Sequence, residues 1–172
     1  MPDPAPADMT VKEKLDTYSF DDGAILSHGF TSYMRDYEIL AEVSDGYHKD
    51  GAGRYTYRFT HCVHASYNTN VRDDTWRISW SDILADYARW KEADTPEGFV
   101  WGVCWAEIYP GLTYLEDSKA ASDWSQRLGQ PLHEIQIETN VYSLNLVFHD
   151  VIITKLGSEA PTLDRVNIPI EP

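Results

Sequence analysis

The chain has 172 residues, of which 42% are hydrophobic and 24% charged, so it is long enough to bury the core of one domain. Its formal net charge is −14, and no cluster of Lys and Arg stands out, which argues against binding to nucleic acid or to anionic membranes. No apolar run approaches the roughly 20 residues that span a bilayer.

The N-terminal segment, residues 1–9, is rich in proline and lacks the basic and apolar regions of a signal peptide. We expect a disordered tail there, and a cytoplasmic protein. The chain has only two cysteines, too few for a disulfide framework, which also favours the cytoplasm, a reducing compartment. Thr10 and Glu13 have the spacing of a capping box and predict a short helix to about Thr17. A turn is expected at residues 21–23.

Alternating apolar and polar residues then predict strands, the first from Asp36 to Val43. The stretch RYTYRFTHCVHASYNTNV (54–71) alternates throughout, with His61 on the apolar face and Cys62 and His64 on the polar face. At about 3.3 Å per residue this strand would extend about 60 Å, whereas a compact chain of this length is about 40 Å across. The strand must therefore bend or bulge near its middle.

The second half of the chain contains five more expected elements. They are a helix at 79–93 with Ser79 or Ser81 as N-cap, a strand at 99–109 ended by a Pro110–Gly111 turn, a helix from Asp117 or Ser118 to Leu128 closed by Gly129, and strands at 132–139 and 141–156. Strands dominate, and their spacing does not fit a repeating βαβ fold. We predict an α+β fold, a mainly antiparallel β-sheet with two or three short helices packed on it. It would form one domain at 10–156, followed by an extended tail at 157–172.

The His-Cys-Val-His sequence in the long strand raises the question of a metal site. Cys62 and His64 lie on one face with Cβ atoms about 7 Å apart, a workable spacing for two ligands. A third ligand, such as His149 or Asp150, would have to come from a distant strand. We favour the alternative, a polar strand face with His61 hydrogen-bonded in the core, and we expect no cofactor.

Asp150 falls on the apolar face of the last predicted strand, where a carboxylate requires a cation or several donors. We favour a structural ion pair with Arg35, Arg54 or Arg58 over catalysis. His149, its neighbour, points to the opposite face and cannot pair with it directly.

Glu107 shares a predicted strand face with Trp101, Trp105 and Tyr109. A carboxylate beside aromatic rings suits the binding of sugar hydroxyls, or an acid with a raised pKa. The alternative is a strand end that reaches solvent. The sequence contains no GxSxG, P-loop, dinucleotide-binding, HExxH or CxxC motif, so the enzyme classes with such signatures have no support.

The segments HGFTSYMRDYEIL (28–40) and YRFTHCVHASYNTNV (57–71) resemble the uncharacterised bacterial YxiG-like family, over the first half of the chain to about Trp80. Members of that family carry similar Tyr-x-Arg-Asp-Tyr and Phe-x-His-Cys-Val-x-Ala segments. The resemblance implies no activity, cofactor or catalytic residue. The toxin-rich gene neighbourhood of the family's namesake suggests an immunity-like role.

We therefore expect a non-enzymatic cytoplasmic interaction protein whose acidic surface binds a basic protein partner, in one form an immunity-type inhibitor. The alternatives are a small metal- or ligand-binding enzyme that uses Cys62 and His64 with His149 or Asp150, and a carbohydrate-binding module with an aromatic groove. The oligomeric state stays open. The candidate binding residues are Arg35, Asp36, His61, His64, Trp101, Trp105, Glu107, Tyr109, His149 and Asp150.

Overall fold

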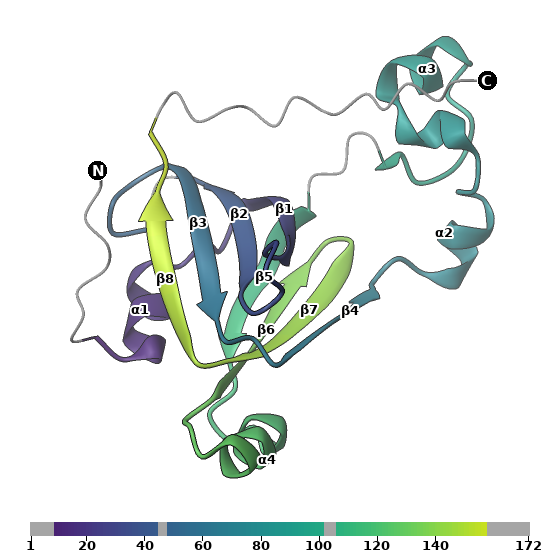
Figure 1. Cartoon of the computed structure of the whole chain (residues 1–172). Helices are drawn as coiled ribbons and strands as arrows, with labels where there is room; N and C mark the ends of the chain where they lie inside the picture. The colour runs from purple at the N-terminus through teal and green to yellow at the C-terminus, as the bar shows by residue number, and fades with distance from the viewer. Residues whose placement is uncertain (1–8, 45–47, 102–105, 158–172) are drawn as a thin grey trace.

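The computed structural model describes residues 9–44, 48–101 and 106–157. In these ranges the chain folds mainly as an eight-stranded antiparallel sheet (Figure 1). The strands are β1 (Ala24–Phe30), β2 (Tyr37–Val43), β3 (Gly53–Thr60), β4 (His64–Thr69), β5 (Ala106–Tyr114), β6 (His133–Thr139), β7 (Tyr142–Phe148) and β8 (Asp150–Lys155). The helices are α1 (Val11–Thr17), α2 (Asp73–Arg77), the 3₁₀ helix η1 (Asp82–Ala85), α3 (Tyr87–Glu92) and α4 (Lys119–Leu128).

This arrangement confirms the α+β fold with a mainly antiparallel sheet, but the described residues form four α-helices rather than two or three. Of these, α1 lies beside β8 and α4 packs on β6 and β7, whereas α2 and α3 belong to an excursion between β4 and β5 that projects from the sheet (Figure 1). No described helix is both long and apolar enough to cross a membrane.

Two bent strands connect the two ends of the sheet to its inner strands. The strand order is β4-β7-β6-β5-β1-β2-β3-β8. β4, at one end, follows directly after β3 in the chain, and β8, at the other end, follows directly after β7, so each outermost strand is the continuation of an inner strand. The pairs β3–β8 and β4–β7 therefore form one long antiparallel pair. Within it, residues 61–63 oppose only residues 148–149, which is a β-bulge, and His61 has a φ of 48°. The predicted bend in the 54–71 stretch is confirmed.

The core lies between the two halves that this bend creates. Phe59 from β3 packs edge-on against Phe148 from β7, with ring centroids 4.8 Å apart. The Tyr57 hydroxyl donates a hydrogen bond to the carbonyl oxygen of Tyr18 at 3.0 Å, so even the polar end of this buried ring is satisfied. The largest fully buried side chains include Phe20, Ile39, Tyr55, Tyr57, Phe59, Ile108, Ile135, Ile137, Leu144, Leu146 and Phe148.

The bulge changes which residues face the core. His61 is exposed and Cys62 is buried, so the expectation of a core His61 and a surface-facing Cys62 is wrong. On the partner strand the buried positions change from even to odd after Phe148, because β7 and β8 are separate strands rather than one at 141–156. Ile152 is consequently 43% exposed. One unpaired residue is enough to exchange the buried and exposed faces of a strand, since side chains alternate with a period of two.

The predicted helix at 79–93 is wrong as one element. Ser81 accepts a hydrogen bond from the backbone of Ile83 and begins only η1, while the side chain of Asp86 accepts from Ala88 and Arg89 and begins α3. The Asp86 cap therefore interrupts a stripe whose spacing is helical throughout. β1 was not predicted, because a register shift between Ile25 and Ser27 breaks its alternation.

The predicted strand at 99–109 is found only in part: residues 99–101 are not in a strand, and residues 102–105 lie outside the described residues. β5 begins at Ala106 and continues through Pro110 and Gly111, which form an irregularity opposite β6 rather than a turn. Gly111 has a φ of 124°, and a Cβ there would lie 2.3 Å from Oδ1 of Asp21, which accepts a hydrogen bond from the Leu112 N–H at 2.9 Å. Only glycine allows this close approach.

The two helices predicted from their caps are confirmed. α1 begins with the capping box of Thr10 and Glu13, and α4 begins at an N-cap Ser118 and ends at Gly129 in the left-handed conformation. The Ser118 hydroxyl accepts a hydrogen bond from the Ala121 N–H at 2.9 Å.

Replacing Ser118 with alanine is expected to lower the free energy of unfolding by about 1 kcal/mol, because a backbone donor of the first turn loses its acceptor. Urea denaturation followed by circular dichroism measures the change. The matched control is Ser122→Ala, an exposed position inside the same helix, which should be neutral or slightly stabilising. Equal midpoints for the two variants would contradict a capping role.

Candidate functional site

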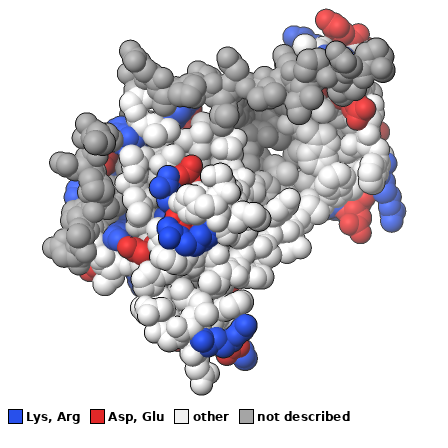
Figure 2. Space-filling view, viewed as in Figure 1, with Lys and Arg blue, Asp and Glu red and all other residues white. Residues whose placement is uncertain are grey.

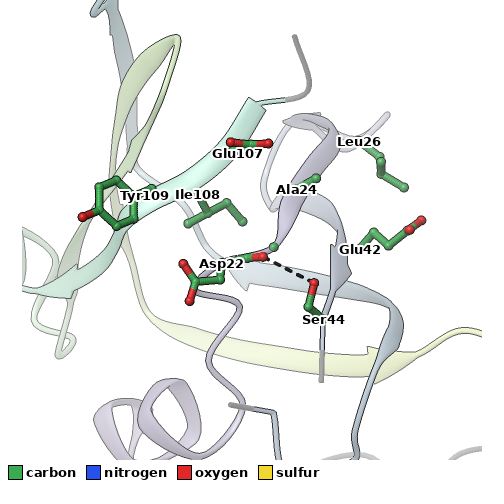
Figure 3. Close-up of a pocket in the computed structure, with 9 residues that line it drawn as sticks. Asp22, Ala24, Leu26, Glu42, Ser44, Glu107, Ile108 and Tyr109 are labelled. Atoms are coloured by element: carbon green, nitrogen blue, oxygen red, sulfur yellow. Dashed lines mark hydrogen bonds between the residues drawn. The ribbon is translucent and has the colours of Figure 1, made fainter. Parts of the chain in front are cut away.

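A pocket of about 510 Å³ lies on the outer face of the sheet, where β1 passes between β5 and β2 (Figure 3). We call it the acidic pocket, because three of its side chains are carboxylates. Its lining residues are Asp22, Gly23, Ala24, Leu26, Glu42, Ser44, Glu107, Ile108 and Tyr109.

The register of the sheet places two of these carboxylates on either side of a methyl group. Ala24 of β1 pairs with Glu42 of β2 on one side and with Glu107 of β5 on the other. Residues directly opposite one another share a face, so the three side chains form one row across the sheet (Figure 3). Adjacent strands lie about 4.8 Å apart, which separates the stems of the two glutamates by about 10 Å. The small side chain of Ala24 leaves the space between them open.

The turn before β1 brings the third carboxylate to the pocket. Asp22 donates its backbone N–H to the Ile108 carbonyl at 3.1 Å, and the Ile108 N–H donates to the Gly23 carbonyl at 2.9 Å. A Cβ on Gly23 would lie 2.7 Å from the backbone oxygen of Glu42, so the turn packs against β2 as only glycine permits. The predicted turn at 21–23 thus joins β5 to the β1–β2 hairpin beside the pocket.

The acidic pocket has an excess of negative charge. None of its lining residues is Lys or Arg. Glu42 is partly neutralised by Arg54, whose Nε lies 3.0 Å from its carboxylate, whereas Asp22 and Glu107 form no ion pair with any described residue. Tyr109, which is 71% exposed, adds an aromatic ring at the rim, with its hydroxyl pointing away from Glu107 and Ala24 (Figure 3). This combination suits an ammonium or guanidinium group.

Arg35, Asp36 and His61 meet in a separate network at the bulge. The buried carboxylate of Asp36 accepts hydrogen bonds from Arg35 Nε at 2.9 Å, Arg35 Nη2 at 3.2 Å, the Tyr33 hydroxyl at 2.9 Å and the His61 backbone N–H at 3.0 Å. The bonds from Arg35 above all hold the pKa of Asp36 well below its usual range, although burial acts in the opposite direction. The Cys62 N–H also donates to the Arg35 carbonyl at 2.8 Å.

This network gives Asp36 a structural role. It fixes the chain at the bulge where β3 becomes β4, and all four hydrogen bonds that the carboxylate accepts come from the protein itself. The two segments that carry the family resemblance come into contact here.

Cys62, His64 and His149 do not form a metal-binding group. The Cys62 thiol donates a hydrogen bond to the His64 carbonyl at 3.2 Å, and burial raises its pKa to about 12, so it stays protonated at neutral pH. His149 Nδ1 lies 2.8 Å from the Pro131 carbonyl, and its ring meets that of His61 edge-on at 5.9 Å. Among the described residues, no three His, Cys, Asp or Glu side chains are arranged to hold a metal ion.

Asp150 forms an ion pair, but the predicted partners are wrong. Lys14 of α1 donates to its carboxylate at 2.7 Å, while Arg54 pairs with Glu42 and Arg58 with a carboxylate of β2. Asp150 lies at the start of β8 with a side chain that is 41% exposed, because the bend removes it from the apolar face on which the sequence pattern placed it.

The predicted aromatic group is divided between two places. Glu107 and Tyr109 line the acidic pocket. Trp101 instead packs against Trp76 and Phe99, each at 4.7 Å between ring centroids, in the excursion. Trp105 lies outside the described residues.

Sequence reasoning missed Asp22, Ala24 and Glu42 as members of a site. The small side chain of Ala24 was the only signal in the sequence that could have indicated an open position. The sequence contains no signal that β1 pairs with β5.

Comparison with known proteins places the chain in one family. No curated protein matches it. The sequence model described as YxiG-like protein matches residues 7–164, which is most of the chain and extends well beyond the two segments quoted above. The chain belongs to the YxiG-like protein family.

Proposed function

We propose that the chain is a non-enzymatic binding protein that receives a cationic side chain of a basic protein partner in the acidic pocket. The observation that carries this proposal is the row Glu42–Ala24–Glu107, with Asp22 two residues before Ala24 and no Lys or Arg among the lining residues. A protein of this kind would act by covering its partner, as an immunity-type inhibitor does.

Physical reasons favour an arginine or lysine side chain over other ligands. A guanidinium has several donors in one plane and forms strong, charge-assisted hydrogen bonds with carboxylates. Glu107 and Asp22 are not neutralised by any described residue, so they are available for such bonds. The net charge of −14 would also attract a basic partner at long range, an effect that salt weakens.

The first experiment is an NMR titration of the ¹⁵N-labelled protein with a short blocked peptide that contains arginine, in comparison with the same peptide containing citrulline. Citrulline keeps the shape of the side chain but removes its charge. We expect the arginine peptide to shift the backbone signals of Ala24, Glu107 and Tyr109, and the citrulline peptide to leave them in place. Binding should weaken as salt is added.

Three variants test whether the pocket is responsible. Glu107→Gln should weaken binding of the arginine peptide about tenfold, since it removes one charge-assisted contact. Glu92→Gln, at an exposed position in α3 outside the pocket, makes the same change in net charge and should have little effect. Ala24→Leu fills the space between the two glutamates without a change in charge and should also abolish the shifts. Equal weakening by Glu107→Gln and Glu92→Gln would mean that only net charge matters and would refute the pocket.

A further inference from the structure

The two free edges of the sheet differ in protection. Exposed edge strands invite pairing with other chains, and proteins block them with lysines, bulges, prolines or a covering element. β8 has such protection, since α1 lies beside it (Figure 1) and Lys14 Nζ lies 3.4 Å from the Val151 carbonyl. β8 also ends in Lys155, whose ammonium lies over the ring of Tyr55.

Among the described residues, β4, at the other end of the strand order, has such protection at its two ends: the β-bulge at residues 61–63 precedes it, and the Trp76 indole N–H of α2 donates a hydrogen bond to the Thr69 hydroxyl at 3.1 Å. Its sequence, HASYNT, contains no charged residue and no proline, and its register with β7 is regular from His64 to Thr69. Four of its six residues are exposed. On the face shown in Figure 2, the part of the sheet where Figure 1 draws β4, β6 and β7 is covered almost entirely by uncharged side chains.

The hydrogen-bond register identifies the open backbone groups. The Asn70 N–H donates to the Val141 carbonyl, so in an antiparallel pair the groups of Asn68, Ser66 and His64 also point toward β7. The N–H and C=O groups of Ala65, Tyr67 and Thr69 therefore point away from the sheet. No described residue forms a hydrogen bond with these groups, which are ready to pair with an additional strand.

Tyr67 provides a side-chain contact for such a strand. It faces the same side as Leu144, its partner across the strand pair, and it is 65% exposed. Its ring lies 5.8 Å from His28 of β1 and 5.9 Å from Tyr142 of β7. A strand added to β4 would place every second side chain beside this aromatic cluster, and aromatic or β-branched side chains pair best there.

We propose that β4 is a docking edge that takes up an extended segment of a basic protein partner, with alternating apolar residues, as an added antiparallel strand. That the partner is cationic rests on the proposed function. Charge favours it over a second copy of this chain, because a pair of copies would bring together two bodies of net charge −14, whereas a basic segment is attracted to one. β4 itself is uncharged, so it repels neither a basic segment nor a second copy of the chain.

Amide hydrogen exchange, measured residue by residue by NMR, tests the proposal. In the free protein at low concentration, the amides of Ala65, Tyr67 and Thr69 should exchange far faster than those of Ser66 and Asn68. The probe is a short soluble peptide in which Lys and Val alternate. At saturation it should slow exchange at the three open amides about tenfold or more.

Two matched pairs separate strand addition from other binding. Tyr67→Lys places a charge on the inner face of the edge and should abolish the protection, while Asn68→Lys makes the same charge change on the outer face and should retain most of it. The same peptide with every second backbone nitrogen methylated cannot form the ladder and should give no protection.

Four results would overturn the proposal. They are slow exchange of the three amides in the dilute free protein, protection that grows with protein concentration in the absence of peptide, equal protection by the methylated peptide, and equal protection by a peptide with Glu in place of Lys. The second would identify a second copy of the chain as the occupant. Protection at β4 that persists in Ala24→Leu would leave the docking edge standing even where the acidic pocket fails its own test.

Discussion

Replacing Phe148 with alanine is expected to lower the free energy of unfolding by about 3–5 kcal/mol, the largest loss that we predict for one side chain. The ring of Phe148 is completely buried and packs edge-on against Phe59 at 4.8 Å. It lies at the end of β7, where the two halves of the sheet meet. The strands around it are held by hydrogen bonds on both sides, so the cavity left by the ring cannot collapse readily.

The matched control is Ile152→Ala, four residues further along the chain in β8. Ile152 is 43% exposed, and its truncation should cost less than about 1 kcal/mol. Denaturation in guanidinium chloride, followed by tryptophan fluorescence and circular dichroism, measures both variants. Similar losses for the two would mean that the change of buried face between β7 and β8 is wrong.

Replacing Asp36 with asparagine is expected to cost about 2–3 kcal/mol at neutral pH. The carboxylate accepts from four donors of Tyr33, Arg35 and His61. Asparagine has one acceptor oxygen in place of two, so its NH₂ group would face donors at a buried position. The loss is smaller than for a fully buried ion pair, because the side chain of Arg35 is 56% exposed and can return to water.

The pH dependence of stability distinguishes the charge of Asp36 from its shape. The pKa of Asp36 is lower in the folded protein than the value of about 3.9 in an unfolded chain, so the folded state holds the proton less tightly. The stabilisation is therefore fully present above about pH 5 and is lost as the pH falls below it. The difference in unfolding free energy between the wild type and Asp36→Asn should shrink as the pH is lowered from neutral toward about 2.

Asp117→Asn is the control for this titration, since Asp117 is exposed and forms no ion pair among the described residues. Its difference from the wild type should stay small at every pH. A difference for Asp36→Asn that stays constant with pH would show that the carboxylate is not the stabilising form.

Local signals in the sequence predicted the elements that local interactions control. The helices α1 and α4 are defined by their own caps, at Thr10, Glu13, Ser118 and Gly129, and both were predicted. β2, β3 and β6 were predicted because apolar residues recur at every second position along each of them, with Leu40 of β2 as an exception. The length of the 54–71 stretch even required its bend, since a straight strand would exceed the diameter of the domain.

Predictions failed where one residue departs from the regular period. The bulge at His61 and the break at His149 change which face of the strands is buried, so Cys62 and Asp150 do not lie on the faces that the alternation predicted. Asp86 ends a helical stripe in the same way. Each irregularity depends on contacts with a partner strand or turn that is distant in the chain, so the residue pattern of the segment alone cannot predict it.

By itself, the sequence determined the α+β class, the dominance of antiparallel strands, the strongly negative charge and the capped helices, because composition, alternation and capping act within a few residues of one another. Only the tertiary structure decided which strands are neighbours. It placed Ala24 between Glu42 and Glu107, joined Asp36 to the backbone of His61, and left β4 at an open edge while α1 protects β8. These juxtapositions arise from the pairing of segments far apart in the chain, which burial and hydrogen bonding in the whole sheet select. The first and the last of them carry the two proposals made for this protein.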